Sequence, residues 1–156
     1  MEWTERFEHS VKSGDLLNAI LAAHIIDLNS VYENLNGMTP LGFAISHNMS
    51  AIVSTLIEHG ALVSLIDSTG YTPLHIASRD KHISLVEELI NAGAKVNSKC
   101  PVGWTPLHVA TWWNRVDVVE ILLKSGADSS ISNHEGYTPR EIAAEEGYRK
   151  ILHILT

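Results

Sequence analysis

The sequence predicts an all-α solenoid of about five helix-turn-helix units joined by β-turn fingers, and three observations predict it. A Gly-x-Thr-Pro motif recurs every 33 residues, starting at Gly37, Gly70, Gly103 and Gly136. A Gly-Ala pair closes an apolar segment in the same frame, at Gly60, Gly93 and Gly126. The apolar residues between these two motifs follow a helical spacing. Since a fixed period of roughly 20–50 residues is typical of stacked repeats, the repeat defines the fold.

Each unit is predicted to begin its first helix at a Thr-Pro step. Threonine is a favoured N-cap, and proline suits the first helical position, where its missing N–H costs nothing. The four threonines are Thr39, Thr72, Thr105 and Thr138. Alanines recur on the first helix and would let neighbouring helices approach closely, at Ala44, Ala77, Ala110 and Ala143.

The end of each predicted helix is marked by a residue that suits a left-handed backbone. Asn48, Lys81, Asn114 and Gly147 fall where the first helix turns into the second. Lys81 fits this conformation least well, because glycine and asparagine adopt it most easily. The glycine of each Gly-Ala pair then ends the second helix.

The two ends of the chain depart from the pattern. Residues 1–36 have helical spacing through Val11, Leu16, Ile20 and Leu21 but lack the Thr-Pro step, and they carry one extra residue before Gly37. We interpret them as a degenerate capping repeat, which needs a polar outer face. Full repeats occupy 37–69, 70–102 and 103–135. Residues 136–156, with Arg140 and Glu141 in place of the apolar residue and the histidine, form a truncated C-terminal cap or end at a cloning boundary. Residues 1–156 are thus expected to form a single domain.

Two units carry a longer motif without a mismatch. Thr72-Pro73-Leu74-His75-Ile76-Ala77 and Thr105-Pro106-Leu107-His108-Val109-Ala110 both read Thr-Pro-Leu-His-x-Ala. From Gly37 onward the chain therefore resembles the ankyrin-repeat family. A tetratricopeptide array has a similar period but lacks this start and the Gly-Ala stop. The resemblance implies a concave groove lined by finger tips and first-helix ends, and histidines that hydrogen-bond locally and order the turn.

Composition excludes several classes of partner and compartment. The net charge of -7 and the pI of about 5.6 argue against binding to nucleic acid or anionic membranes. The most apolar run, residues 19–26, is far shorter than the ~20 residues that span a bilayer. A single cysteine, Cys100, allows no intrachain disulfide and fits a reducing compartment. We expect a monomeric protein of the cytoplasm or nucleus.

Neither catalysis nor metal binding is predicted. The nine histidines include no pair or cluster with the spacing that zinc requires, and His75 and His108 belong to the repeat motif. Cys100 occupies the turn position of Asp67 and Asn133, so we expect an exposed turn residue rather than a nucleophile. No glycine-rich phosphate loop is present. We therefore predict no catalytic residue, no metal and no cofactor, and a protein that is not an enzyme.

Positions that vary between units are the candidates for binding, because the invariant ones build the core. The predicted partner-binding residues at finger tips and helix ends are Met38, His47, Tyr71, Arg79, Asp80, Trp104, Trp112, Trp113, Tyr137, Glu145 and Glu146. Adjacent tryptophans on a helix point about 100° apart, so at least one of Trp112 and Trp113 is expected to be exposed. The other interpretation is that one ring fills space between the fourth and fifth units.

These residues favour a protein-interaction module or scaffold, such as an inhibitor or adaptor in signalling, that holds a protein or peptide in its groove. Glu145 and Glu146 suggest a basic segment in that partner. One alternative is a reader of methylated lysine, with Trp104, Trp112, Trp113 and Glu145 around the cation. Another is the targeting domain of a larger multidomain protein.

Overall fold

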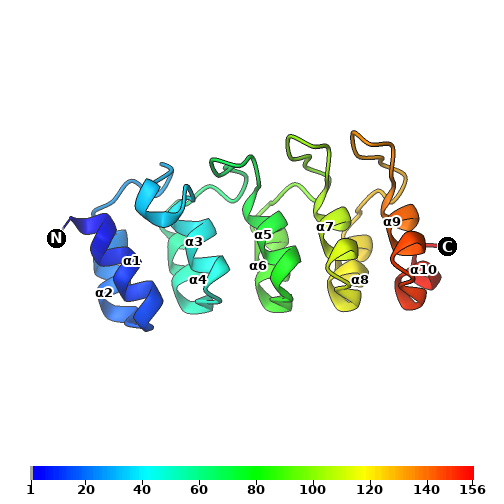
Figure 1. Cartoon of the computed structure of the whole chain (residues 1–156). Coiled ribbons are helices and arrows are strands. Elements are labelled where there is room, and N and C mark those ends of the chain that lie inside the picture. Colours follow the sequence, from blue (N-terminus) through cyan, green and yellow to red (C-terminus); the bar gives the residue numbers. More distant parts are fainter. Residues whose placement is uncertain (1) are drawn as a thin grey trace. The chain divides into compact units, whose positions relative to one another are not determined.

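A computed structural model describes residues 2–156, and this part of the chain is helical (Figure 1). Its helices, in order, are α1 (Trp3–Ser13), α2 (Leu16–Ala23), the 3-10 helix η1 (Glu33–Leu35), α3 (Pro40–Ser46), α4 (Ser50–Glu58), α5 (Pro73–Asp80), α6 (Ile83–Asn91), α7 (Pro106–Trp112), α8 (Val116–Lys124), α9 (Pro139–Glu145) and α10 (Arg149–Ile154). The ten α-helices confirm the predicted all-α fold of about five helix pairs. No helix within residues 2–156 has the length and apolar character needed to cross a bilayer.

The chain divides into two compact units, residues 1–76 and 77–156. In the first unit α1 packs on α2, α3 packs on α4, and α2 also contacts α4. In the second unit α7 packs on α8 and on α9, while α8 contacts both α6 and α10. Each unit therefore stacks helix pairs side by side. The loops that precede α7 and α9 project to the same side of their helices (Figure 1).

The Thr-Pro steps start helices as predicted. The Oγ1 atom of each threonine accepts the N–H of the residue three positions later: Gly42 at 3.1 Å, His75 at 3.4 Å, His108 at 3.4 Å and Glu141 at 3.3 Å. Glu141 also replaces the histidine of the motif chemically, because its carboxylate accepts the N–H of Thr138 at 2.7 Å. This backbone hydrogen bond lowers the pKa of Glu141. The substitution that looked like a departure thus preserves the cap.

The predicted turn residues do adopt the left-handed conformation. The backbone φ angles are 56° at Asn48, 65° at Lys81, 53° at Asn114 and 72° at Gly147. Lys81 conforms although lysine lacks the short polar side chain that favours this region. The stacking of helix pairs therefore outweighs the local preference of one residue.

The fingers of the last three repeats have the same turn geometry. In each, the residue at the turn position donates its N–H to the carbonyl of the residue four positions on, as Asn133 does to Tyr137 at 2.9 Å. Its own carbonyl accepts the N–H of the following glycine, at 3.1 Å for Gly136. Asp67 and Asn133 add a side-chain oxygen that accepts two further N–H groups of the turn.

The prediction that Cys100 is an exposed turn residue is wrong. Its exposed fraction is 4%, and Asn133 at the equivalent position is 6% exposed. The physical reason is that the side chain at this position points into the finger, where an oxygen can reach the N–H groups of the turn. Cys100 takes the same direction and is therefore enclosed.

Because Cys100 is buried, we expect its thiol to react with an aromatic disulfide reagent at least about tenfold more slowly in the native protein than in urea. The absorbance of the released thiolate measures both rates. Equal rates in the two states would show that the finger around Cys100 opens freely.

The first helix pair differs from the predicted polar cap. Val11 is buried as expected, but Leu16 and Leu21 are 38% and 47% exposed. The buried face of α2 is formed instead by Ala19, Ala22 and Ala23. Small side chains let α2 lie close to its neighbours, so the leucines fall on the outer side. The exposed face of α2 is therefore apolar, whereas Glu5, His9 and Lys12 are exposed on α1.

Candidate functional site

A hollow of about 300 Å³ in the second unit gathers several of the predicted binding residues. Its lining consists of Trp104, Trp112, Asn133, Glu135, Tyr137, Ile142, Glu145 and Glu146. Two fingers contribute Trp104 and the stretch from Asn133 to Tyr137. Helix α7 contributes Trp112 at its last position, and α9 with its C-cap contributes Ile142, Glu145 and Glu146. The hollow is thus built from two consecutive fingers and the helices that follow them.

The aromatic side of the hollow is a pair of indoles. The rings of Trp104 and Trp112 meet edge to face with centroids 5.6 Å apart. Trp104 is half-buried, whereas Trp112 is 45% exposed. The carbonyl of Trp112 accepts a hydrogen bond from the Tyr148 hydroxyl at 3.4 Å, which ties the end of α7 to the start of α10. The pair therefore exposes aromatic surface to solvent on a helix end that is fixed by a hydrogen bond.

Acidic side chains also line the hollow. Glu135, Glu145 and Glu146 are all exposed. The charge of Glu145 raises the pKa of Tyr137, and a hydrogen bond between the two side chains adds to this rise. Tyr137 is thus hydrogen-bonded to Glu145, and it lines the same hollow as the two indoles.

His108 positions the finger that carries Tyr137. Its Nδ1 accepts the N–H of Thr105 at 3.2 Å, so this nitrogen carries no proton. Its Nε2 lies 3.0 Å from the Tyr137 carbonyl and donates its proton there. Burial lowers the pKa of His108, which keeps the ring neutral. The expected local role of the motif histidine is confirmed, and it extends to the next finger.

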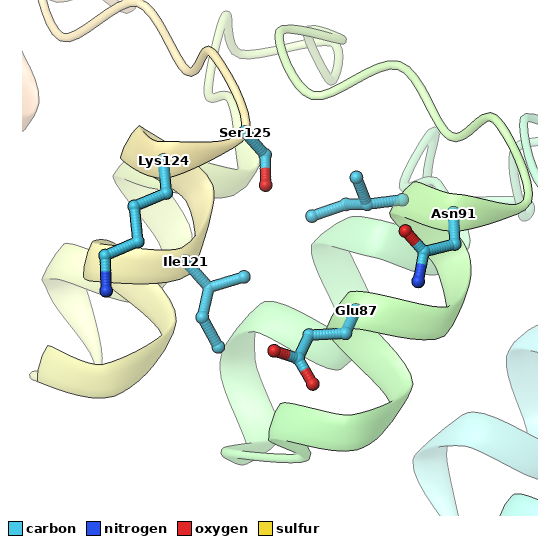
Figure 2. Close-up of a pocket in the computed structure, with 6 residues that line it drawn as sticks. Glu87, Asn91, Ile121, Lys124 and Ser125 are labelled. Carbon is cyan, nitrogen blue, oxygen red and sulfur yellow. The ribbon is translucent and has the colours of Figure 1, made fainter.

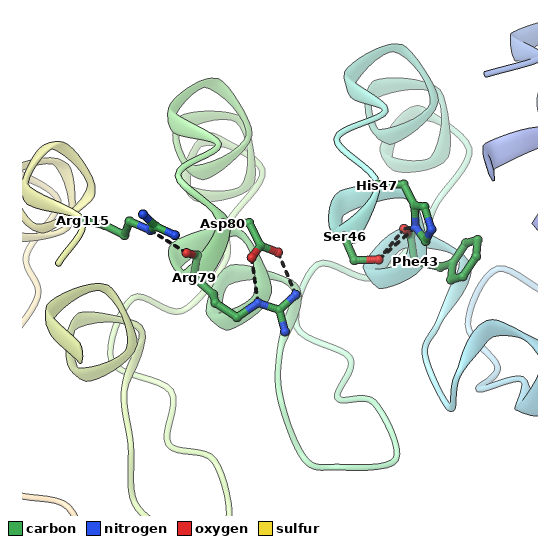
Figure 3. Close-up of polar contacts among 6 residues, drawn as sticks. All are labelled: Phe43, Ser46, His47, Arg79, Asp80 and Arg115. Carbon is green, nitrogen blue, oxygen red and sulfur yellow. Dashed lines mark hydrogen bonds and ion pairs between the residues drawn. The ribbon is translucent and has the colours of Figure 1, made fainter. Parts of the chain in front are cut away.

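Three predicted binding residues lie in the first unit. Met38 is half-buried and forms an antiparallel bridge with Tyr32. Tyr71 is half-buried with its ring edge to face with His75, at 5.5 Å between centroids. The His47 ring lies against Phe43, and its Nδ1 is 2.9 Å from the Phe43 carbonyl (Figure 3).

The remaining predicted residues lie in the second unit outside the hollow. Arg79 and Asp80 form a two-point ion pair, with both N···O distances 2.7 Å, and the Arg79 carbonyl accepts a hydrogen bond from Arg115 Nε at 2.8 Å (Figure 3). Trp113 is 48% exposed and is the C-cap of α7. Both adjacent tryptophans are thus exposed, which satisfies the expectation that at least one would be.

Three lining residues were not predicted. Asn133 was predicted only as a turn residue. Ile142 lies at the repeat position of Ile76 and Val109 and is buried like them. Glu135 precedes the repeat glycine at a finger tip, where the sequence varies from unit to unit. That variability was the available signal for Glu135.

Two other hollows differ in chemistry. One of about 450 Å³ lies between α6 and α8, where Figure 2 shows Glu87 on one helix and Lys124 on the other. One of about 390 Å³ in the first unit is lined by Trp3 and by Arg6, whose guanidinium lies 4.9 Å from the Trp3 ring centroid. Among the described residues, no three histidine, cysteine or acidic side chains are grouped as a metal site would require.

The chain matches a known protein family. A family profile described as "Ankyrin repeats (3 copies)" matches residues 8–100 and, in a second placement, residues 82–156. A comparison with curated proteins finds no match.

Proposed function

Because the chain belongs to the ankyrin-repeat family, whose repeats are generally non-catalytic protein-interaction modules, we propose that it binds a segment of a partner protein. The proposed site is the hollow lined by Trp104, Trp112 and Tyr137. Its biochemistry is then to hold that partner, as an inhibitor, adaptor or scaffold of the cytoplasm or nucleus. The single observation that carries the proposal is the exposure of Trp112 beside Trp104 and Tyr137.

Exposed indoles are the physical basis of this proposal. Tryptophan is enriched among the residues that dominate binding energy at interfaces. Trp112 and Trp113 are each close to half exposed, and Tyr137 is 36% exposed. Exposed aromatic rings of this kind cost solvation free energy until a partner covers them. An interface centred on Trp112 would recover that free energy.

Charge indicates the kind of partner. Residues 134–147 contain four glutamates and one arginine, and three of the glutamates line the hollow. Complementary charge steers association and selects partners. The partner segment is therefore proposed to be basic.

Selection from a random 12-residue peptide display library tests the proposed site. Wild-type protein should enrich peptides whose affinity falls about 30-fold on Trp112→Ala, the effect of losing about 2 kcal/mol at a hot spot. Trp3→Ala removes an exposed tryptophan of the first unit and should leave affinity unchanged. Trp113→Ala reports whether the site extends beyond the hollow. Peptides that bind Trp112→Ala as tightly as wild type would exclude the hollow.

A second candidate ligand is methylated lysine, which aromatic rings recognise through their negative faces. The observation in its favour is that Trp104, Trp112 and Tyr137 line one hollow with Glu145. Trp113, which completed the cage expected from the sequence, does not line it.

A further inference from the structure

We infer that the hollow lined by Trp104, Trp112 and Tyr137 receives the side chain of an arginine from the partner segment. This inference rests on the proposed function and names the residue that the site recognises. The hollow is small enough to take a single side chain. About 300 Å³ lies at the lower limit of small-molecule sites, so it suits one long side chain rather than a folded element.

The aromatic surface favours a flat cation. A guanidinium is planar, weakly hydrated and stacks on indole faces, whereas an ammonium is compact and strongly hydrated. The protein already makes this contact within its first unit, where Arg6 lies over Trp3. In the second unit the half-exposed Trp112 offers such a surface to an external side chain.

The carboxylates of the hollow distinguish arginine from trimethyl-lysine. Glu135, Glu145 and Glu146 line the same hollow. A guanidinium has five N–H donors and pairs with carboxylates at two points. Trimethyl-lysine has no N–H, so it would cover these carboxylates without giving them a hydrogen bond. Removing a carboxylate from water without a partner is costly. The three glutamates therefore select the donor-rich cation.

The two other hollows described above do not offer this combination. The hollow between α6 and α8 carries Glu87 and Lys124, charges of opposite sign, and no aromatic ring. The hollow beside Trp3 already contains Arg6, which hydrogen-bonds to Asn18. The hollow beside Trp112 combines three aromatic rings with three carboxylates, and neither lysine nor arginine lines it.

Titration of the full chain with short peptides tests the inference. The probes are Gly-Ser-Gly-Arg-Gly-Ser-Gly and its lysine, trimethyl-lysine and citrulline counterparts, followed through the indole N–H signals of Trp104 and Trp112 by NMR. The arginine peptide should bind at least about fivefold more tightly than each of the others. Citrulline is the matched control, because it keeps the shape and loses the charge.

Two protein variants complete the test. Glu145→Gln combined with Glu146→Gln should weaken binding of the arginine peptide by about tenfold, whereas Glu87→Gln, on α6, should leave it unchanged. Equal binding of citrulline, tighter binding of trimethyl-lysine, or no response to the arginine peptide would each overturn the inference. Library peptides that depend on Trp112 but tolerate replacement of their arginines by citrulline would leave the proposed function standing without it.

Discussion

Replacing Gly103 with alanine is expected to lower the free energy of unfolding by about 3 kcal/mol. Gly103 has φ of +80°, which an L side chain adopts only with strain. A Cβ atom there would also lie 2.9 Å from the backbone nitrogen of His134. That nitrogen donates to the Val102 carbonyl at 3.1 Å, so the next finger cannot retreat without losing the bond. Urea denaturation followed by circular dichroism measures the change.

Gly136 provides the matched control for this substitution. Its φ is +90°, and an added Cβ would meet no heavy atom within 4 Å. Gly136→Ala therefore carries the backbone strain alone and should cost about 1–2 kcal/mol. If the two variants were equally stable, the close approach of the two fingers would contribute nothing. The Gly103 variant should also shift the NMR signals of Trp104 and Tyr137, since the added Cβ would press on the backbone of Asn133 and His134, next to the lining of the hollow.

Replacing His108 with leucine is expected to cost about 2–3 kcal/mol, because it leaves a buried N–H and a carbonyl without their ring partners. The N–H belongs to Thr105, and the carbonyl is that of Tyr137. His108→Asn places an oxygen near the Nδ1 position and should retain part of the first bond while losing the second. Urea denaturation at pH 7.5 ranks the three proteins, and an asparagine variant no more stable than the leucine variant would show that the bond to Thr105 contributes little.

The same histidine gives stability a pH dependence of known sign. Burial lowers the pKa of His108 in the folded state below its ordinary value of 6.5. As pH falls below about 6.5, unfolded chains bind a proton that folded chains still exclude, so the free energy of unfolding decreases. The loss continues until the pH reaches the pKa of the folded state, with a slope of at most about 1.4 kcal/mol per pH unit. The contribution is fully present above pH 6.5.

Comparing wild type with His108→Leu between pH 5.5 and 7.5 isolates this term, because the other histidines are common to both. The difference in free energy of unfolding between the two proteins should shrink as the pH is lowered. A constant difference across this range would show that His108 titrates alike in the folded and unfolded chains.

Much of the fold follows from residues close together in the sequence. Thr-Pro steps and left-handed turn residues act through their own backbone, so Thr105, Asn48 and Gly147 could be placed without knowledge of their neighbours. The 33-residue repetition then extends one unit to the whole array. Lys81 shows that the repeat was a better guide than the propensity of a single residue.

Burial could not be predicted in the same way. Cys100 and Asp67 share a position in the repeat, yet the direction of that side chain depends on the turn around it. Leu16 and Leu21 look like core residues by type, but the alanines of α2 pack more closely against α1 and α4. Which apolar residue is enclosed depends on the neighbour that covers it.

The sequence by itself thus determined the repeat, the helix starts and turns, and the aromatic and acidic residues at variable positions. The tertiary structure decided which of those residues share a hollow. Trp112 faces Trp104 and the acidic end of α9, while Trp113, one position later, lies outside, because successive helical residues diverge by about 100°. Glu135 lies on the finger that His108 positions through its hydrogen bond to the Tyr137 carbonyl. These two residues are 29 positions apart in the sequence, so no local pattern encodes their contact.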